Sequence, residues 1–316
     1  MNNMKNNILN ISHDYYHYLL NLKNVNAIGY GSKYINGHDT KEPCIHVLVE
    51  NKIDVSYLTK NTIIPKTFMG IKTDVIKIGK LRNKNSDSSE PTLGMIRPIE
   101  GGYDVSADTK KLGTIGCIVT NIIDNKNEYY ILSNNHILAD GNNIPIGSPI
   151  YQPSIYYSSE FYKEQIGTLA NFINIKYGNL KPFLKTNYMD CAIAHITNKN
   201  LISNKIAHIG AVKGVSTPEK DLSIKKVGAM SGLTEGKIET LGVTTISKNP
   251  RGKFALFKNQ IRASIINKSG DSGSVVLNKK NEIIGLFFSG TDDDQTMMFT
   301  DINVVLKALK VKIYVG

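Results

Sequence analysis

The sequence has little of three residue types that mark many small or unusual folds. Its 316 residues include no Trp, ten Pro and three Cys, at Cys44, Cys117 and Cys191. The odd number and wide spacing of the cysteines argue against a disulfide framework, and no His or second Cys stands at a spacing typical of a zinc site. We therefore expect buried, reduced thiols, a cytoplasmic location and no metal, with a catalytic cysteine or a metal ligand as the alternatives.

Long runs of one residue class are also missing. No stretch of about 18 apolar residues occurs, and the first twenty residues lack the apolar core and cleavage site of a signal peptide. The formal charge is +11, yet no basic run exceeds two residues. These absences disfavour membrane insertion, secretion and nucleic-acid binding, because strong phosphate binding needs clustered cations.

The order of apolar and polar segments indicates two domains. Before residue 80, apolar residues at helical spacing and strand-like runs predict a small α/β domain, with helices at 13–22 and 54–60 and strands at 25–31, 44–50 and 74–79. The polar stretch that follows lacks apolar periodicity and is typical of a linker. We place the N-terminal domain at 1–80, the linker at 81–95 and a larger domain at 96–316.

The larger domain consists of short apolar runs between turns rich in Gly and Asn. Many short strands with such turns predict an all-β barrel or sandwich. Only the last apolar segment, 303–310, has helical spacing. The region as a whole is therefore expected to be mainly β, with one helix near its end.

The motif SGDSGS at 269–274 is the strongest chemical signal. A serine hydroxyl is a poor nucleophile, and it needs a base and a tight turn whose backbone N–H groups converge on the developing oxyanion. Gly270 and Gly273 would allow such a turn around Ser272. The alternative interpretation is an ordinary Gly- and Ser-rich surface loop.

Two further segments supply a base and a carboxylate. His136 follows a strongly apolar strand in ILSNNHILA, and an imidazole can accept a serine proton at neutral pH. Asp190 leads the apolar run DCAIA, where a carboxylate is costly unless it has a buried partner. A structural histidine and a solvated strand end are the respective alternatives. The chain order His136, Asp190, Ser272 is nevertheless that of the chymotrypsin triad.

On these motifs, residues 110–316 resemble the trypsin-like, chymotrypsin-fold serine peptidases. GTIGCIV resembles their opening strand, LSNNHIL the histidine motif, MDCAIA the aspartate motif and GDSGS the serine motif. The small N-terminal domain followed by RPIEGG is similar to a group of bacterial, cytoplasmic trypsin-like proteins. The resemblance implies a double β-barrel that lacks the usual stapling cysteines, with Asn134 and Asn135 in place of small residues before the histidine.

The resemblance also implies residue roles. Ser272 would attack a peptide carbonyl, His136 would transfer the proton, Asp190 would orient the imidazole, and the N–H groups of Gly270 and Ser272 would bind the oxyanion. Asp271 would brace the loop from inside. No cofactor is implied.

The substrate pocket is likewise placed by resemblance. Ile266 would form its floor, Phe288 and Gly290 its walls, and Met297 would lie deep in the closing strand. With no acid at the floor, we expect cleavage after small or medium apolar side chains, unless an acid of the 292–294 loop reaches in.

The expected function is endopeptidase cleavage of a protein or peptide substrate, with the N-terminal domain as a docking module for a partner. Activation by cutting before Ile99 is disfavoured, since Pro98 precedes it. A partner-binding pseudo-enzyme and a nucleic-acid-binding protein are the competing hypotheses.

Overall fold

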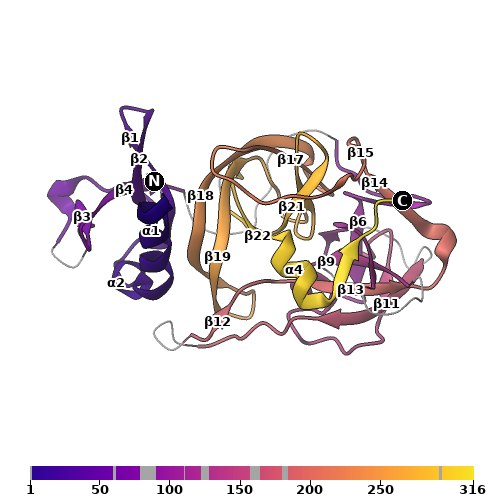
Figure 1. Ribbon diagram of the computed structural model, residues 1–316. Helices are drawn as coiled ribbons and strands as arrows, with labels where there is room; N and C mark the ends of the chain where they lie inside the picture. Colours follow the sequence, from indigo (N-terminus) through magenta and orange to yellow (C-terminus); the bar gives the residue numbers. More distant parts are fainter. Residues whose placement is uncertain are drawn as a thin grey trace.

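Two curled β-sheets and a small N-terminal unit make up the protein (Figure 1). The computed structural model describes residues 2–59, 62–78, 90–109, 111–121, 128–156, 164–179, 184–291 and 294–316. Most of the secondary structure is strand, which confirms the predicted mainly β, double-barrel fold with a small N-terminal α/β part. No helix within these ranges is long and apolar enough to cross a membrane.

The N-terminal unit packs two helices on a short sheet. Its elements are α1 (Asn2–Asp14), α2 (Tyr16–Leu20), β1 (Val25–Ile35), β2 (His38–Val49), the single 3-10 turn η1 (Val55–Tyr57), β3 (Thr67–Phe68) and β4 (Ile71–Lys77). The helix predicted at 13–22 is thus two helices that meet at Tyr15, and the helix predicted at 54–60 is only the 3-10 turn. The Asn-rich sequence of α1 conceals a short apolar stripe, in which Ile8 and Ile11 are buried at helical spacing.

The first barrel is built on an eight-stranded sheet in the order β23-β8-β9-β13-β11-β10-β6-β7. Its strands are β6 (Asp104–Ala107), β7 (Gly113–Thr114), β8 (Cys117–Asn121), β9 (Tyr129–Ser133), β10 (Pro149–Tyr151), β11 (Gln165–Phe172), β13 (Ala192–Ile196) and β23 (Val311–Ile313), and the short helix α3 (Asn135–Leu138) follows β9. A separate three-stranded sheet joins β5 (Ile99–Gly101), β14 (Ile202–Ile206) and β15 (Gly210–Ala211), with a 3-10 turn η3 at Lys199–Leu201.

The second barrel closes through the pairing of β18 with β19. Its strands are β12 (Thr186–Asn187), β16 (Gly214–Val215), β17 (Ser223–Gly228), β18 (Gly232–Lys248), β19 (Phe254–Ile265), β20 (Val275–Asn278), β21 (Glu282–Gly290) and β22 (Thr296–Asp301). Helix α4 (Ile302–Leu309) then leads back to the first barrel, where β23 pairs with β8. The helix predicted at 303–310 is confirmed, and the Asp301 side chain caps it by accepting a hydrogen bond from the Asn303 N–H.

Strand alternation divides the core into layers. Along β8, Ile118 faces the interior of the first barrel, whereas Cys117 and Val119 face a cluster shared with the second barrel and with α4. That shared cluster includes Val227 and Leu286 of the second barrel. The two barrels are therefore held together by apolar burial, and the cleft between them lies on a fixed base.

The N-terminal unit continues the sheet of the second barrel. Strand β1 pairs antiparallel with β18, with Ala27 opposite Thr245. One face of the N-terminal sheet packs on α1, and the opposite face places Ala27 and Leu48 in a cluster with Phe257 and Phe288 of the second barrel. This intimate contact was not predicted, because the sequence shows the polar segment between the domains but not which strand edges are exposed.

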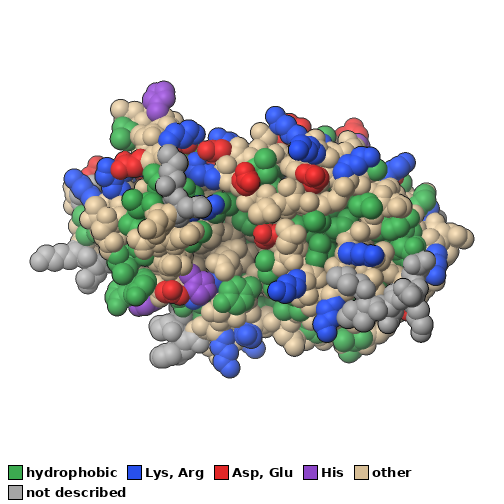
Figure 2. Space-filling model, in the orientation of Figure 1, with side chains coloured by type: hydrophobic (Ala, Val, Ile, Leu, Met, Phe, Trp, Pro, Cys, Tyr) green, Lys and Arg blue, Asp and Glu red, His purple; other side chains and the backbone are tan. Residues whose placement is uncertain are grey.

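The predicted linker lies mostly outside the described residues. Within the described range 90–109, Thr92 is buried. Its N–H donates to the Ala229 carbonyl, and its hydroxyl donates to the Gly102 carbonyl. Thr92 is therefore hydrogen-bonded to segments of the large domain. Figure 2 shows Lys and Arg side chains scattered over the visible face among acidic ones, with no continuous basic stripe on that face.

Candidate active site

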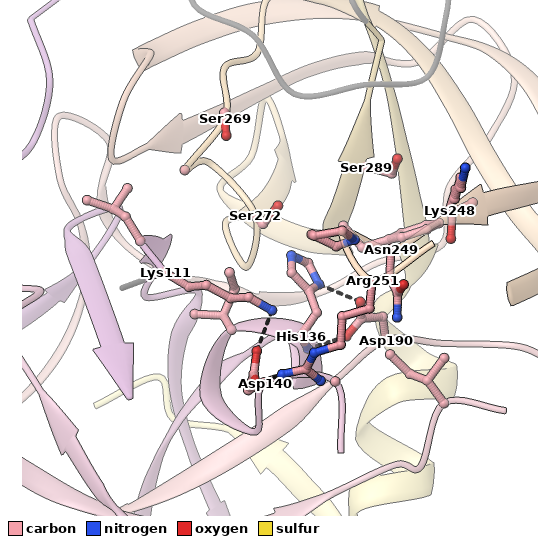
Figure 3. Close-up of a pocket in the computed structure, with 18 of the residues that line it drawn as sticks. Lys111, His136, Asp140, Asp190, Lys248, Asn249, Arg251, Ser269, Ser272 and Ser289 are labelled. Carbon is pink, nitrogen blue, oxygen red and sulfur yellow. Dashed lines mark hydrogen bonds and ion pairs between the residues drawn. The ribbon is translucent and has the colours of Figure 1, made fainter. Parts of the chain in front are cut away.

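A cleft of about 820 Å³ brings together the three residues predicted to act in catalysis. His136 and Asp190 enter it from the first barrel, and Ser272 enters it from the second (Figure 3). These residues are far apart in the sequence and meet because the barrels pack face to face. The segment 141–186 contributes Tyr156, Ile175 and Tyr177 to the cleft edge.

The imidazole of His136 is held by Asp190 through two contacts. His136 Nδ1 lies 2.5 Å from Asp190 Oδ2, and the His136 backbone N–H donates to Asp190 Oδ1 at 3.1 Å. The Asp190 side chain is 5% exposed and that of His136 is 28% exposed. A buried carboxylate with a fixed imidazole leaves Nε2 of the ring as the nitrogen available for proton transfer.

The two asparagines before the histidine anchor this pair. Asn134 and Asn135 are fully buried. The Asn134 amide donates to the Asp190 carbonyl oxygen at 2.6 Å, and the Asn135 amide donates to the Ile173 carbonyl oxygen at 2.7 Å. Their place in the sequence looked like a departure from the family pattern, and the contacts show that they tie α3 to the segments carrying the aspartate and the cleft edge.

The serine loop needs glycine at two positions. Gly270 has φ +104° and Gly273 has φ +97°, which other residues rarely adopt. A Cβ on Gly270 would lie 2.3 Å from a methyl carbon of Leu112, and one on Gly273 would lie 2.1 Å from Ser133 Oγ. The GDSGS pattern therefore reflects a steric requirement around Ser272.

The loop is hydrogen-bonded to the histidine barrel by Thr114. The Thr114 N–H donates to the Ser272 carbonyl oxygen at 2.8 Å, and its hydroxyl donates to the Gly270 carbonyl oxygen at 2.8 Å. Within the described part of the chain, the N–H groups of Gly270 and Ser272 have no hydrogen-bond acceptor. Both donors are therefore available to an oxygen in the cleft.

Asp271 points away from the cleft into the second barrel, where it meets a cation that sequence reasoning missed. Lys226 Nζ lies 2.7 Å from Asp271 Oδ2, and both side chains are 0% exposed. The carboxylate also accepts from the N–H groups of Met230, Ser231 and Lys268. Burial lowers the pKa of Lys226, and the attraction of Asp271 opposes this shift.

The residues expected to form the substrate pocket are placed unevenly. Phe288 lines the cleft, whereas Ile266, Gly290 and Met297 are not among its lining residues. Met297 is fully buried in the core of the second barrel. A further residue, Asn267, is buried beside Gly290, so that a Cβ on Gly290 would lie 1.8 Å from Asn267 Oδ1. The space expected for a deep side-chain pocket is therefore occupied by an amide.

The acidic run at 292–294 is only partly visible, since Asp292 and Asp293 lie outside the described residues. Asp294 is buried, and its backbone carbonyl accepts from the N–H and the amide of Asn267. It does not line the cleft.

The three cysteines are buried and form no disulfide. Cys44, His46 and Asp74 place one potential ligand atom each within 4.8 Å of one another, a grouping that the sequence spacing did not suggest. Both ring nitrogens of His46 are already hydrogen-bonded, to the Thr240 hydroxyl and the Ser32 carbonyl. Burial also raises the pKa of the Cys44 thiol to about 12. The three side chains therefore form a polar contact in the core.

Comparison with known proteins gives one family match, and it covers the serine segment. The family model of peptidase S7, the flavivirus NS3 serine protease, matches residues 261–300. No curated protein sequence matches the chain.

Similar solved structures include the following three proteases. Protease A of Thermobifida fusca shares 18% identity, with a TM-score of 0.49 over 69% of this chain and 99% of that one. The Nocardiopsis protease NAPase shares 17% identity, with a TM-score of 0.48 over 68% and 98% of the two chains. Cellulomonas bogoriensis chymotrypsin shares 19%, with a TM-score of 0.44 over 69% and 99%.

The first barrel contributes a carboxylate-bound histidine, the second a glycine-flanked serine, and the family match falls on the serine segment. The serine segment is therefore similar to that of a serine protease family, and it lies in a double β-barrel beside a histidine that a carboxylate holds.

Proposed function

We propose that the protein is an endopeptidase that cleaves peptide bonds through an acyl-enzyme, with Ser272 as nucleophile, His136 as general base and Asp190 as the orienting carboxylate. The observation that carries the proposal is the 2.5 Å contact between His136 Nδ1 and Asp190 Oδ2, in a cleft that Ser272 also lines.

The proposed reaction has two halves. Ser272 Oγ attacks the peptide carbonyl carbon while His136 Nε2 takes its proton, and the imidazolium then protonates the departing amine as the C–N bond breaks. Water, deprotonated by His136, next attacks the acyl carbon and releases Ser272 with its proton restored. Asp190 stabilises the imidazolium in both halves.

The oxyanion would be bound by the N–H groups of Gly270 and Ser272. Donors that are already aimed at the developing charge contribute most of their energy in the transition state. The contacts of Asp271 with Lys226 and with three backbone N–H groups support this proposal, because they hold the turn from behind.

Specificity for small apolar side chains before the cut remains our proposal, with Phe288 as the residue of the expected pocket that lines the cleft, and Ile266, Gly290 and Met297 outside its lining. Its support is the absence of an acid at Ile266 and the position of Asn267 beside Gly290. A buried amide leaves little room, and an unpaired guanidinium there would be strongly disfavoured. Cleavage-site profiling of Asn267→Ala should therefore show larger apolar residues than the parent accepts.

The biological setting is proposed as regulated cleavage of an intracellular protein partner in the cytoplasm. The N-terminal unit, placed at 1–80 with a linker to 95, would serve as the docking module. The support is the sheet that it shares with the second barrel and its packing against Phe257 and Phe288, which both line the cleft.

The test of the mechanism is covalent labelling. A fluorophosphonate should modify the intact chain at Ser272 and should leave Ser272→Ala unlabelled, while Ser269→Ala, which changes another serine of the cleft, should still be labelled. Unlabelled parent protein that is folded would indicate a partner-binding pseudo-enzyme instead.

A further inference from the structure

The rim of the cleft carries more positive than negative charge. Lys111, Lys248 and Arg251 all line it, and the acids among its described lining residues are Asp140 and Asp190. Asp190 is buried against His136 and is engaged there. Among the described lining residues, Asp140 is therefore the one remaining acid, against three cations.

Asp140 is shared between two of those cations from opposite barrels. Its Oδ1 lies 2.5 Å from Lys111 Nζ, and its Oδ2 lies 2.7 Å from Arg251 Nη2. Burial raises the pKa of Asp140, but the hydrogen bonds and charges of Lys111 and Arg251 outweigh this effect, so the net shift is downward. Asp140 is ionised at neutral pH and can balance only one of its two partners.

The cations keep unused donors. The Arg251 side chain is 55% exposed, and one nitrogen of its five-donor fork makes the contact with Asp140. The Lys111 side chain is 35% exposed. Figure 3 shows both side chains converging on Asp140 beside His136, in the cleft that Ser272 also lines.

The position of Arg251 follows from the hairpin that joins β18 to β19. Asn249, Pro250 and Arg251 extend over the cleft from the second barrel, and Lys248 at the end of β18 holds its ammonium 5.6 Å from the Phe254 ring centre. The positive rim is therefore built on a defined element of the barrel.

We propose that the cleft recognises peptide segments with an acidic side chain near the cleaved bond, and that Arg251 and Lys111 are its anchors. The proposal rests on the peptidase function proposed above and adds a substrate class to it. An Asp or Glu side chain can accept two parallel hydrogen bonds from a guanidinium, whereas Asn or Gln of the same shape lacks the charge. A cleft in which positive charges outnumber negative ones also concentrates ligands of negative charge.

The experiment begins with a proteome-derived peptide library digested by the purified full-length protein. Asp or Glu should be enriched over Asn and Gln within a few residues of the cut. One cleaved peptide is then made as an acid and amide pair, and the ratio of kcat/KM values is measured. The acid should be preferred by roughly tenfold, the usual worth of a charge-assisted hydrogen bond, and less at high salt.

Two variants and one control locate the effect. Arg251→Gln and Lys111→Gln should each lower the acid-to-amide ratio severalfold. Lys253→Gln removes the same charge from the same hairpin, at a residue that does not line the cleft, and should preserve the ratio. Equal ratios in Arg251→Gln and Lys253→Gln, or a library with no acidic enrichment, would overturn the proposal.

A binding measurement separates this proposal from the catalytic one. Fluorescence anisotropy with Ser272→Ala should show tighter binding of the acidic peptide than of its amide twin, whether or not the parent cleaves either. Binding preference without cleavage would refute only the mechanism, and cleavage without preference would refute only the acid recognition.

Discussion

Replacement of Lys226 by Met tests whether a buried ion pair holds the serine loop in its working shape. Lys226 and Asp271 are both 0% exposed, with 2.7 Å between Nζ and Oδ2. Removal of one partner from a buried pair leaves an uncompensated charge, which costs about 3–5 kcal/mol. Three backbone N–H groups still solvate the Asp271 carboxylate, so we expect the lower end of that range.

The expected loss of about 3 kcal/mol should lower the urea midpoint by roughly 1 M, given a typical slope of up to 3 kcal/mol per M. Activity should fall as well, because an unpaired Asp271 can move toward water and carry Gly270 and Ser272 with it. The double variant Lys226→Met with Asp271→Asn should regain much of the stability, since no charge is then buried alone. Its serine should nevertheless react slowly with a fluorophosphonate.

Lys225→Met is the matched control, because it removes the neighbouring charge of the same strand, which is only partly buried. Urea unfolding followed by fluorescence, together with the labelling rate, gives both readouts. If Lys226→Met unfolds at the midpoint of Lys225→Met and labels at the parental rate, the ion pair does not support the loop. The uncut chain should also react, because Ile99 is buried within β5 and Lys226 is the cation that pairs with Asp271.

Further outcomes are expected for the triad, for pH and for the domain contact. Ser272→Ala and His136→Ala should each abolish turnover with little loss of folding, and Asp190→Asn should reduce kcat by roughly 10⁴-fold; retention of near-parental hydrolysis by either alanine variant would disprove the mechanism. As the pH is raised, activity should be lost at a pH below the ordinary pKa of a lysine, because burial lowers the pKa of Lys226. A lowered folded-state pKa means that the unfolded state binds the proton of Lys226 more tightly, so this group makes the fold more stable as the pH rises from its folded to its unfolded pKa. Circular dichroism should therefore show a folded, inactive protein at that pH. Unfolding that coincides with the loss of activity would contradict this prediction. Lys258→Met should loosen the N-terminal unit by about 1–3 kcal/mol, since Lys258 Nζ donates to the His13 carbonyl at 2.7 Å and lies 4.6 Å from the Tyr16 ring centre; hydrogen exchange over α1 no faster than in the parent would argue against it.

Local sequence was a good guide wherever the backbone imposes the residue type. Gly270 and Gly273 have positive φ and tight surroundings, so their pattern around Ser272 could be read without a structure. Short apolar runs between turns rich in Gly and Asn likewise predicted the mainly β fold, because such turns end one short strand and begin the next. The start of α1 was missed because Ile8 and Ile11 are few apolar markers among many asparagines.

Contacts between distant segments could not be predicted in this way. The sequence pattern suggests that Lys226, beside Lys225, is a surface residue. The pairing of β17 with β20 instead brings it beneath the serine loop. The approach of Asn267 to Gly290 depends in the same way on the neighbouring strands.

One stretch of chain is enough to specify the glycine-flanked serine, the histidine after a buried strand, the aspartate before another, and the short apolar runs between turns. Which charges meet depends on the packing of distant segments, because a charge becomes costly or useful only when packing sets both its burial and its partner. That is why Asp140 between Lys111 and Arg251, and Asp271 against Lys226, became visible only once the two barrels were in place.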